Sequence, residues 1–128
     1  MIKATLNNDI LNKILEIEKN KDALNLVKLP ANLSNKFRKN TKKKSSYDSN
    51  RIEGNPLTYE QADAAIESKN RHFLKPEQEI RNNYLALELL EKKLENQEPI
   101  SLKLILEIQK QICDGEPKEK IGLRGMMP

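Results

Sequence analysis

The residues with the clearest chemical potential lie between Ser49 and Asn55, in the sequence Ser-Asn-Arg-Ile-Glu-Gly-Asn. Ser49 and Glu53 are four residues apart, so a helix places both on one face. Gly54 follows where a helix C-terminus favours a left-handed residue, and Asn55-Pro56 prevents the helix from continuing. A carboxylate here meets the negative pole of the helix dipole, which costs about 0.3 to 1 kcal/mol. We therefore expect Glu53 to pair with a cation elsewhere, an arginine being best suited.

Other parts of the sequence must position this carboxylate. Ile52 lies on a neighbouring helical face, where we expect it to anchor the turn in a core. Either Ser45 or Ser46 can cap the start of the helix. The preceding run, 36–44, holds six basic residues in nine positions. We interpret this run as a solvated linker rather than a nucleic-acid footprint, because it lacks interleaved aromatic residues apart from Phe37 and has no recognition-helix signature.

The S-x-x-x-E-G-N pattern, continued by Pro-Leu-Thr at 56–58, resembles the inhibitory-helix motif of Fic-family proteins, S/T-x-x-x-E-G/N. Three later segments are similar to landmarks of that family, in the same order. Residues 79–87 resemble the E-V/I-x-N-x-x-x-A helix that opens the Fic domain. Residues 99–109 resemble the next helix, I-S/T-x-x-x-I-x-x-I/L-H, with Gln109 where histidine is usual. Residues 122–124 resemble the G-x-F/Y/L-R that follows, so the resemblance covers 45–124.

This resemblance implies an all-α helical bundle, the N-terminal part of a Fic-type fold, and a regulatory role in a protein adenylyltransferase that uses ATP and Mg to modify a protein hydroxyl. Glu53 is then the inhibitory carboxylate, supported by Ser49, Gly54 and Asn55, and it pairs with the second arginine of the catalytic signature. That signature, H-x-F-x-D/E-G-N-G-R-x-x-R, is absent from this chain, and the only histidine, His72, lacks its context. We expect no catalytic residue, metal site or bound cofactor in the chain itself, and no AMP transfer by the chain alone.

Three interpretations stay open. In the first, the chain is the autoinhibitory portion of a Fic protein whose catalytic core follows in cis. In the second, it is a stand-alone, antitoxin-like inhibitor of a separate Fic protein in trans, although such partners do not usually carry helices that resemble the enzyme's own domain. In the third, it is a basic helical module that binds nucleic acid.

Composition agrees with a helical protein. The chain has 128 residues, of which a third are charged, with a net charge of +4, four glycines and no tryptophan. Alternating Val/Thr/Tyr runs are absent, which indicates helices around an aliphatic core. The single cysteine, Cys113, excludes an internal disulfide, and we expect it to be buried as a small hydrophobe. No stretch approaches the ~18 apolar residues of a membrane span and no signal peptide is evident, so we expect a cytoplasmic protein without a membrane partner.

The predicted helices define three regions. Residues 1–44 form an N-terminal helical region with the basic linker, including a helix from Asn8-Asp9 and a short piece around Leu33. Residues 45–70 hold the inhibitory helix and a second helix that starts with a capping box at 58–61. Residues 76–128 hold the first helices of a Fic domain, one opened by Pro76 and one starting at Ser101. We expect part of their apolar surface to be uncovered, so that the isolated chain is loosened or self-associates unless a Fic core covers it.

Overall fold

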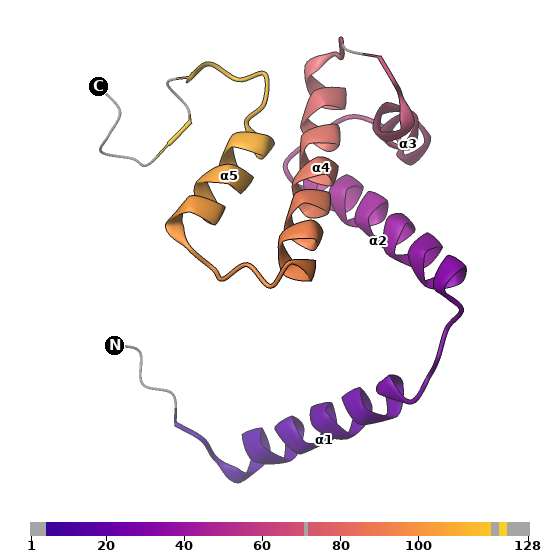
Figure 1. Cartoon of the computed structure of the whole chain (residues 1–128), viewed down its shortest axis with the longest axis vertical. Coiled ribbons are helices and arrows are strands. Elements are labelled where there is room, and N and C mark those ends of the chain that lie inside the picture. Colours follow the sequence, from indigo (N-terminus) through magenta and orange to yellow (C-terminus); the bar gives the residue numbers. More distant parts are fainter. Residues whose placement is uncertain (1–4, 71, 119–120, 123–128) are drawn as a thin grey trace. The chain divides into compact units, whose positions relative to one another are not determined.

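The computed structural model describes residues 5–70, 72–118 and 121–122, and within them the chain is all-helical, with five helices and no strand. The helices are α1 (Asn8–Asn25), α2 (Ala31–Ile52), α3 (Tyr59–Glu67), α4 (Lys75–Glu95) and α5 (Leu102–Ile112), as Figure 1 shows. The chain divides into two compact units, residues 1–35 and 36–128. The second unit contains the candidate site.

Helix α1 belongs to the first unit. Its N-cap is Asn7, whose side chain accepts a hydrogen bond from the backbone N–H of Ile10 at 2.9 Å. The helix has apolar residues at helical spacing, as predicted, but none of its residues is buried. Its apolar face is therefore uncovered within its own unit.

Helix α2 is one continuous helix of 22 residues. The sequence had predicted a short helix near Leu33, a solvated basic linker over 36–44 and a separate helix leading to Glu53. That prediction is wrong, because Lys and Arg are good helix formers and no Gly or Pro interrupts the run. Ser45 and Ser46 therefore lie within the helix and cap nothing.

Helix α3 starts at the predicted capping box. The hydroxyl of Thr58 accepts from the backbone N–H of Gln61 at 3.3 Å, and the side chain of Gln61 accepts from the N–H of Thr58 at 2.9 Å. Helix α4 starts one residue before Pro76, and the carboxylate of Glu77 accepts from the N–H of Leu74. Helix α5 starts where expected, with Ser101 as its N-cap.

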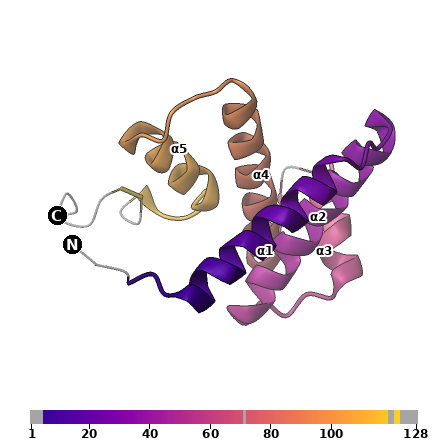
Figure 2. The ribbon, with the colours of Figure 1, turned by 90° about the horizontal axis from the view of Figure 1, so that it is seen from below.

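The core of the second unit lies where α3 meets α4. It consists of Ala62, Ile66, Ile80 and Tyr84, and the partly buried Tyr47, Leu57 and Leu85 pack against it. Ile80 is 0% exposed, and full burial of such a side chain stabilises the fold by about 1.5 to 3 kcal/mol. Helices α4 and α5 form a hairpin and lie side by side in both views (Figure 1, Figure 2).

One end of that hairpin is less well covered. Leu104 is the buried apolar residue of α5, whereas Ile105 and Ile112 are exposed, as is Leu94 near the end of α4. The apolar stripes expected from the sequence are therefore present, and parts of them face outward within the described residues.

Candidate functional site

The turn that follows α2 has the geometry of a Schellman motif. The N–H of Asn55 donates to the carbonyl of Asn50 at 2.9 Å, and the N–H of Gly54 donates to the carbonyl of Arg51 at 3.0 Å. Gly54 has a φ of +89°, in the left-handed region that a Cβ atom disfavours. The predicted helix end after Glu53 is therefore confirmed, and Glu53 occupies the C-cap position.

Glu53 and Ser49 are both exposed near the C-terminal end of α2. Within the described residues, Glu53 has no ion-pair or hydrogen-bond partner for its carboxylate. The nearest basic residue in the sequence, Arg51, is engaged elsewhere: its guanidinium donates to the hydroxyl of Tyr47 at 2.8 Å and lies 5.8 Å from the centre of that ring. The carboxylate of Glu53 is thus presented to solvent and is available to a cation from outside.

The prediction that Ile52 anchors this turn in a core is wrong. Ile52 is 83% exposed and does not enter a core. Instead Asn50 and Ser46, one turn apart, are the buried residues of this face, and the amide of Asn50 donates to the carbonyl of Ser46 at 2.8 Å. Periodicity alone could not find this, because both side chains are polar and hydrophobic patterning does not count them.

Asn55 fixes the turn to the start of α4. Its amide nitrogen donates to the carbonyl of Pro76 at 2.9 Å, and its amide oxygen accepts from the N–H of Leu57 at 3.1 Å. The resemblance had named Asn55 as part of the inhibitory motif without giving it a partner. The structure assigns it the contact that holds the C-terminus of α2 against a second helix.

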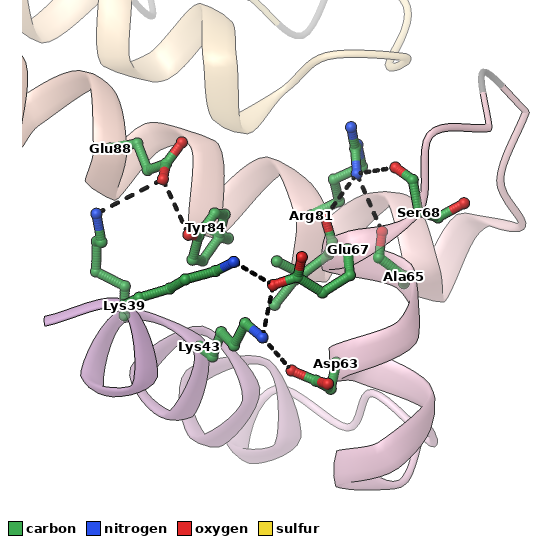
Figure 3. Close-up of polar contacts among 11 residues, drawn as sticks. Lys39, Lys43, Asp63, Ala65, Glu67, Ser68, Arg81, Tyr84 and Glu88 are labelled. Atoms are coloured by element: carbon green, nitrogen blue, oxygen red, sulfur yellow. Dashed lines mark hydrogen bonds and ion pairs between the residues drawn. The ribbon is translucent and has the colours of Figure 1, made fainter. Parts of the chain in front are cut away.

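A network of ions joins the middle of α2 to α3 (Figure 3). The ammonium of Lys43 lies 2.6 Å from Asp63 and 2.7 Å from Glu67, and that of Lys39 lies 2.6 Å from Glu67. Burial lowers the pKa of Lys43, but its hydrogen bonds to Asp63 and Glu67 outweigh burial and the net shift is upward. Hydrogen bonds from Lys39 and then Lys43 lower the pKa of Glu67 from 4.5 to about 2.

A second group of ions joins α2 to α4. Lys42 pairs with Glu91 and lies 3.6 Å from Glu88, and Glu88 also accepts from the hydroxyl of Tyr84 at 2.9 Å. Burial, and then this hydrogen bond, raises the pKa of Tyr84. Arg38 lies 3.5 Å from Glu91.

The basic run is therefore structural rather than a linker. The residues of the run that pair with carboxylates are Arg38, Lys39, Lys42, Lys43 and Lys44. Such pairing reduces the uncompensated positive charge that a nucleic-acid phosphate would meet. The sequence could not reveal these pairs, because most of the carboxylates come from α3 and α4.

Arg81 connects α4 to the end of α3 (Figure 3), a contact that no sequence pattern predicted. One guanidinium nitrogen donates to the carbonyls of Ala65, Ile66 and Ser68 at 2.9 to 3.1 Å. These carbonyls belong to the last turn of α3 and to its C-cap residue Ser68, where a helix lacks internal partners. Arg81 also stacks on Phe73, with 5.0 Å between the guanidinium carbon and the ring centre.

Asn82 performs a similar role at the end of α5. It is 2% exposed, and its amide nitrogen donates to the carbonyls of Ile112 at 3.1 Å and Asp114 at 2.8 Å. Its amide oxygen accepts from Gln78 at 2.6 Å. The asparagine of the E-I-x-N segment is thus a buried joint between α4 and α5.

Gln109, which stands where the resembling Fic helix usually has histidine, contacts the segment that follows α5. It is half-buried, its amide nitrogen donates to the carbonyl of Gly122, and its amide oxygen accepts from the N–H of Gly122, both at 3.1 Å. Gln109 therefore ties the segment after α5 back to that helix. The remaining positions of the Gly-Leu-Arg segment, Leu123 and Arg124, lie outside the described residues.

The remaining histidine and cysteine have simple environments. His72 is exposed, and Cys113, which was expected to be buried, is only partly buried. In the described part of the chain, no group of three or more His, Cys, Asp or Glu side chains is placed to hold a metal ion. Nor does any described helix combine the length and apolar character needed to cross a membrane.

Comparisons with known proteins found no relative of this chain. No protein-family model matches this chain, and neither a curated protein nor a solved structure matches it. The candidate site therefore rests on the geometry of the segment from Ser49 to Asn55 and on the contacts that hold it.

Proposed function

We propose that this chain is the regulatory portion of a Fic-type protein adenylyltransferase, and that Glu53 is the carboxylate that inhibits it. The observation that carries the proposal is the exposure of the Glu53 carboxylate. This carboxylate is unpaired within the described residues, yet the turn that contains Glu53 is held by two hydrogen bonds between its flanking residues. A charged group on a fixed backbone, without a partner of its own, suits recognition of an external cation.

The proposed partner is an arginine of the Fic catalytic signature, as the sequence resemblance implies. Arginine presents a planar fork that binds a carboxylate through two parallel hydrogen bonds. While Glu53 holds this arginine, the γ-phosphate of the substrate ATP loses a contact that it needs to settle in line for nucleotidyl transfer. The pair resists opening, because either charge alone would be left desolvated.

The contacts around α2 favour a fixed position for the backbone that carries this carboxylate. Asn55 joins the turn to α4, and the Lys43 ion pairs join α2 to α3. The Fic catalytic core is the proposed partner, in cis or in trans. The contacts made by the buried Asn82 and the half-buried Gln109 favour the cis arrangement, because they fall in segments that resemble the enzyme's own domain.

The test begins with the codons that follow Pro128 in the gene. Where they encode the H-x-F-x-D/E-G-N-G-R signature, the whole protein is expressed; where they do not, this chain is mixed with a Fic catalytic core lacking an inhibitory glutamate. AMP transfer from labelled ATP is then measured for the wild type, Glu53→Gln and Glu53→Gly. The chain without a catalytic core is the blank and should transfer no AMP.

Loss of a charged pair of about 1.5 to 3 kcal/mol predicts that both Glu53 variants raise AMP transfer by about one order of magnitude or more. The matched control is Glu95→Gln, which removes another exposed carboxylate at a helix C-terminus. Equal labelling by the wild type and the Glu53 variants would refute the proposal.

A further inference from the structure

Helix α1 presents an apolar seam that nothing in its own unit covers. Ile10, Ile14, Ile17 and Leu24 are 38%, 43%, 64% and 72% exposed. Their spacings of four, three and seven residues match a heptad repeat, with Ile14 at an a position and the other three at d positions. The remaining a position within this stretch is Lys21.

The charges that flank the seam are complementary to a second copy of the same helix. In a parallel coiled coil, a g residue faces the e residue five positions further on in the partner. In this frame, Lys13 is at g and Glu18 is at the following e, so each copy offers a cation where the other offers an anion.

A second flanking pair within α1 matches as well, because Asn20 at g meets Asn25 at e. Charge therefore faces opposite charge and amide faces amide at the two g–e pairs of the helix. An antiparallel pairing matches e positions with e positions, which sets Glu18 against Glu18 of the second copy.

We propose that α1 pairs with α1 of a second copy of this chain as a parallel, in-register, two-stranded coiled coil. Isoleucine at both a and d would by itself favour three or four strands, and a single lysine at an a position selects against them. In two strands the long stem of Lys21 can cover the seam while its ammonium reaches water. This inference does not depend on the proposed function, because α1 contains none of the residues of the candidate site.

The test measures the mass of the full chain by sedimentation equilibrium over a range of concentrations. We expect a reversible dimer. Ile17→Lys, at a d position, should abolish it, whereas Leu15→Lys, at the b position outside the seam, should leave it intact. Both variants introduce the same good helix former, and circular dichroism checks that each keeps its helix content.

Charge reversal tests the register. Lys13→Glu and Glu18→Lys should each weaken the dimer by roughly tenfold, since each replaces two attractions with two repulsions, and the double variant should restore it. A monomer or a trimer at all concentrations would overturn the proposal. So would a double variant as weak as the singles, or an equal loss of the dimer in Leu15→Lys.

Discussion

The amide of Asn55 donates to the main-chain carbonyl of Pro76 at 2.9 Å, and this contact fixes the end of α2 to the start of α4. The same side chain accepts from the N–H of Leu57. One residue after the helix thus serves both the local turn and a contact with another helix. Glu53, two residues earlier, takes its position from this arrangement.

Asn55→Ala should weaken inhibition while leaving the carboxylate of Glu53 in place. Removing two hydrogen bonds of about 1 kcal/mol each loosens the turn, so AMP transfer should rise several-fold, less than it does in Glu53→Gln. The assay is the labelling experiment proposed above, with Asn70→Ala, an exposed asparagine, as the control. If AMP transfer with the Asn55→Ala variant equals that with the wild type, this contact does not position Glu53.

Asn82→Ala should destabilise the second unit by about 2 to 3 kcal/mol, because two carbonyls at the end of α5 lose a buried donor. Urea unfolding followed by circular dichroism measures the change. Asn83→Ala, one position along α4 and less buried, is the matched control and should have a much smaller effect. Equal urea midpoints for Asn82→Ala and Asn83→Ala would show that the hydrogen bonds of Asn82 do not stabilise the contact between α4 and α5.

The pairs of Glu67 predict a particular loss of stability in acid. Its pKa is lowered from 4.5 to about 2 in the folded chain, so its contribution is present above about pH 4.5 and is lost as pH falls through about 2. Comparison of the wild type with Glu67→Gln should therefore show a gap in urea midpoint that narrows from about pH 6 to about pH 3.

The size of this gap will be modest, because the Glu67 side chain is 46% exposed and solvent screens its pairs. Glu95→Gln serves as the control, since Glu95 has no ion-pair partner among the described residues. A gap for Glu67→Gln that stays constant over the pH range would contradict the ion-pair explanation.

The outward-facing apolar residues of α4 and α5 should bind a dye that fluoresces on apolar surfaces. Ile105 is 53% exposed and Leu94 is 60% exposed, and exposed apolar side chains are what such a dye binds. Ile105→Lys should lower the fluorescence, whereas Lys103→Gln on the same helix should not. A dye-negative chain that unfolds sharply would instead indicate a closed core and favour the stand-alone inhibitor.

Local signals in the sequence were sufficient for the helix ends. The Thr58 capping box, the Ser101 cap and the left-handed Gly54 each depend on residues within a few positions, and all three are confirmed. The choice of Glu53 as an exposed carboxylate at a helix end followed from the same local reasoning. Its use as an inhibitor stays a prediction.

Features that depend on contacts with distant residues were not predicted from the sequence. The run 36–44 was interpreted as solvated because its partners, among them Asp63, Glu67 and Glu91, lie on other helices. Ile52 was placed in a core because apolar residues usually are, yet polar Asn50 takes the buried position on this helix. Burial of a polar side chain becomes recognisable only when its hydrogen-bond partners are in place.

The paired hydrogen bonds between Gln109 and Gly122 also make this link indifferent to protonation. A side-chain amide carries an NH2 donor group and a carbonyl acceptor at every physiological pH, so it can bind both the carbonyl and the N–H of Gly122 in acid and base alike. A neutral histidine in the same place could also donate and accept, but near its pKa of about 6.5 it would gain a proton and lose its acceptor. With glutamine at this position, the two hydrogen bonds to Gly122 persist when the pH of the cell changes.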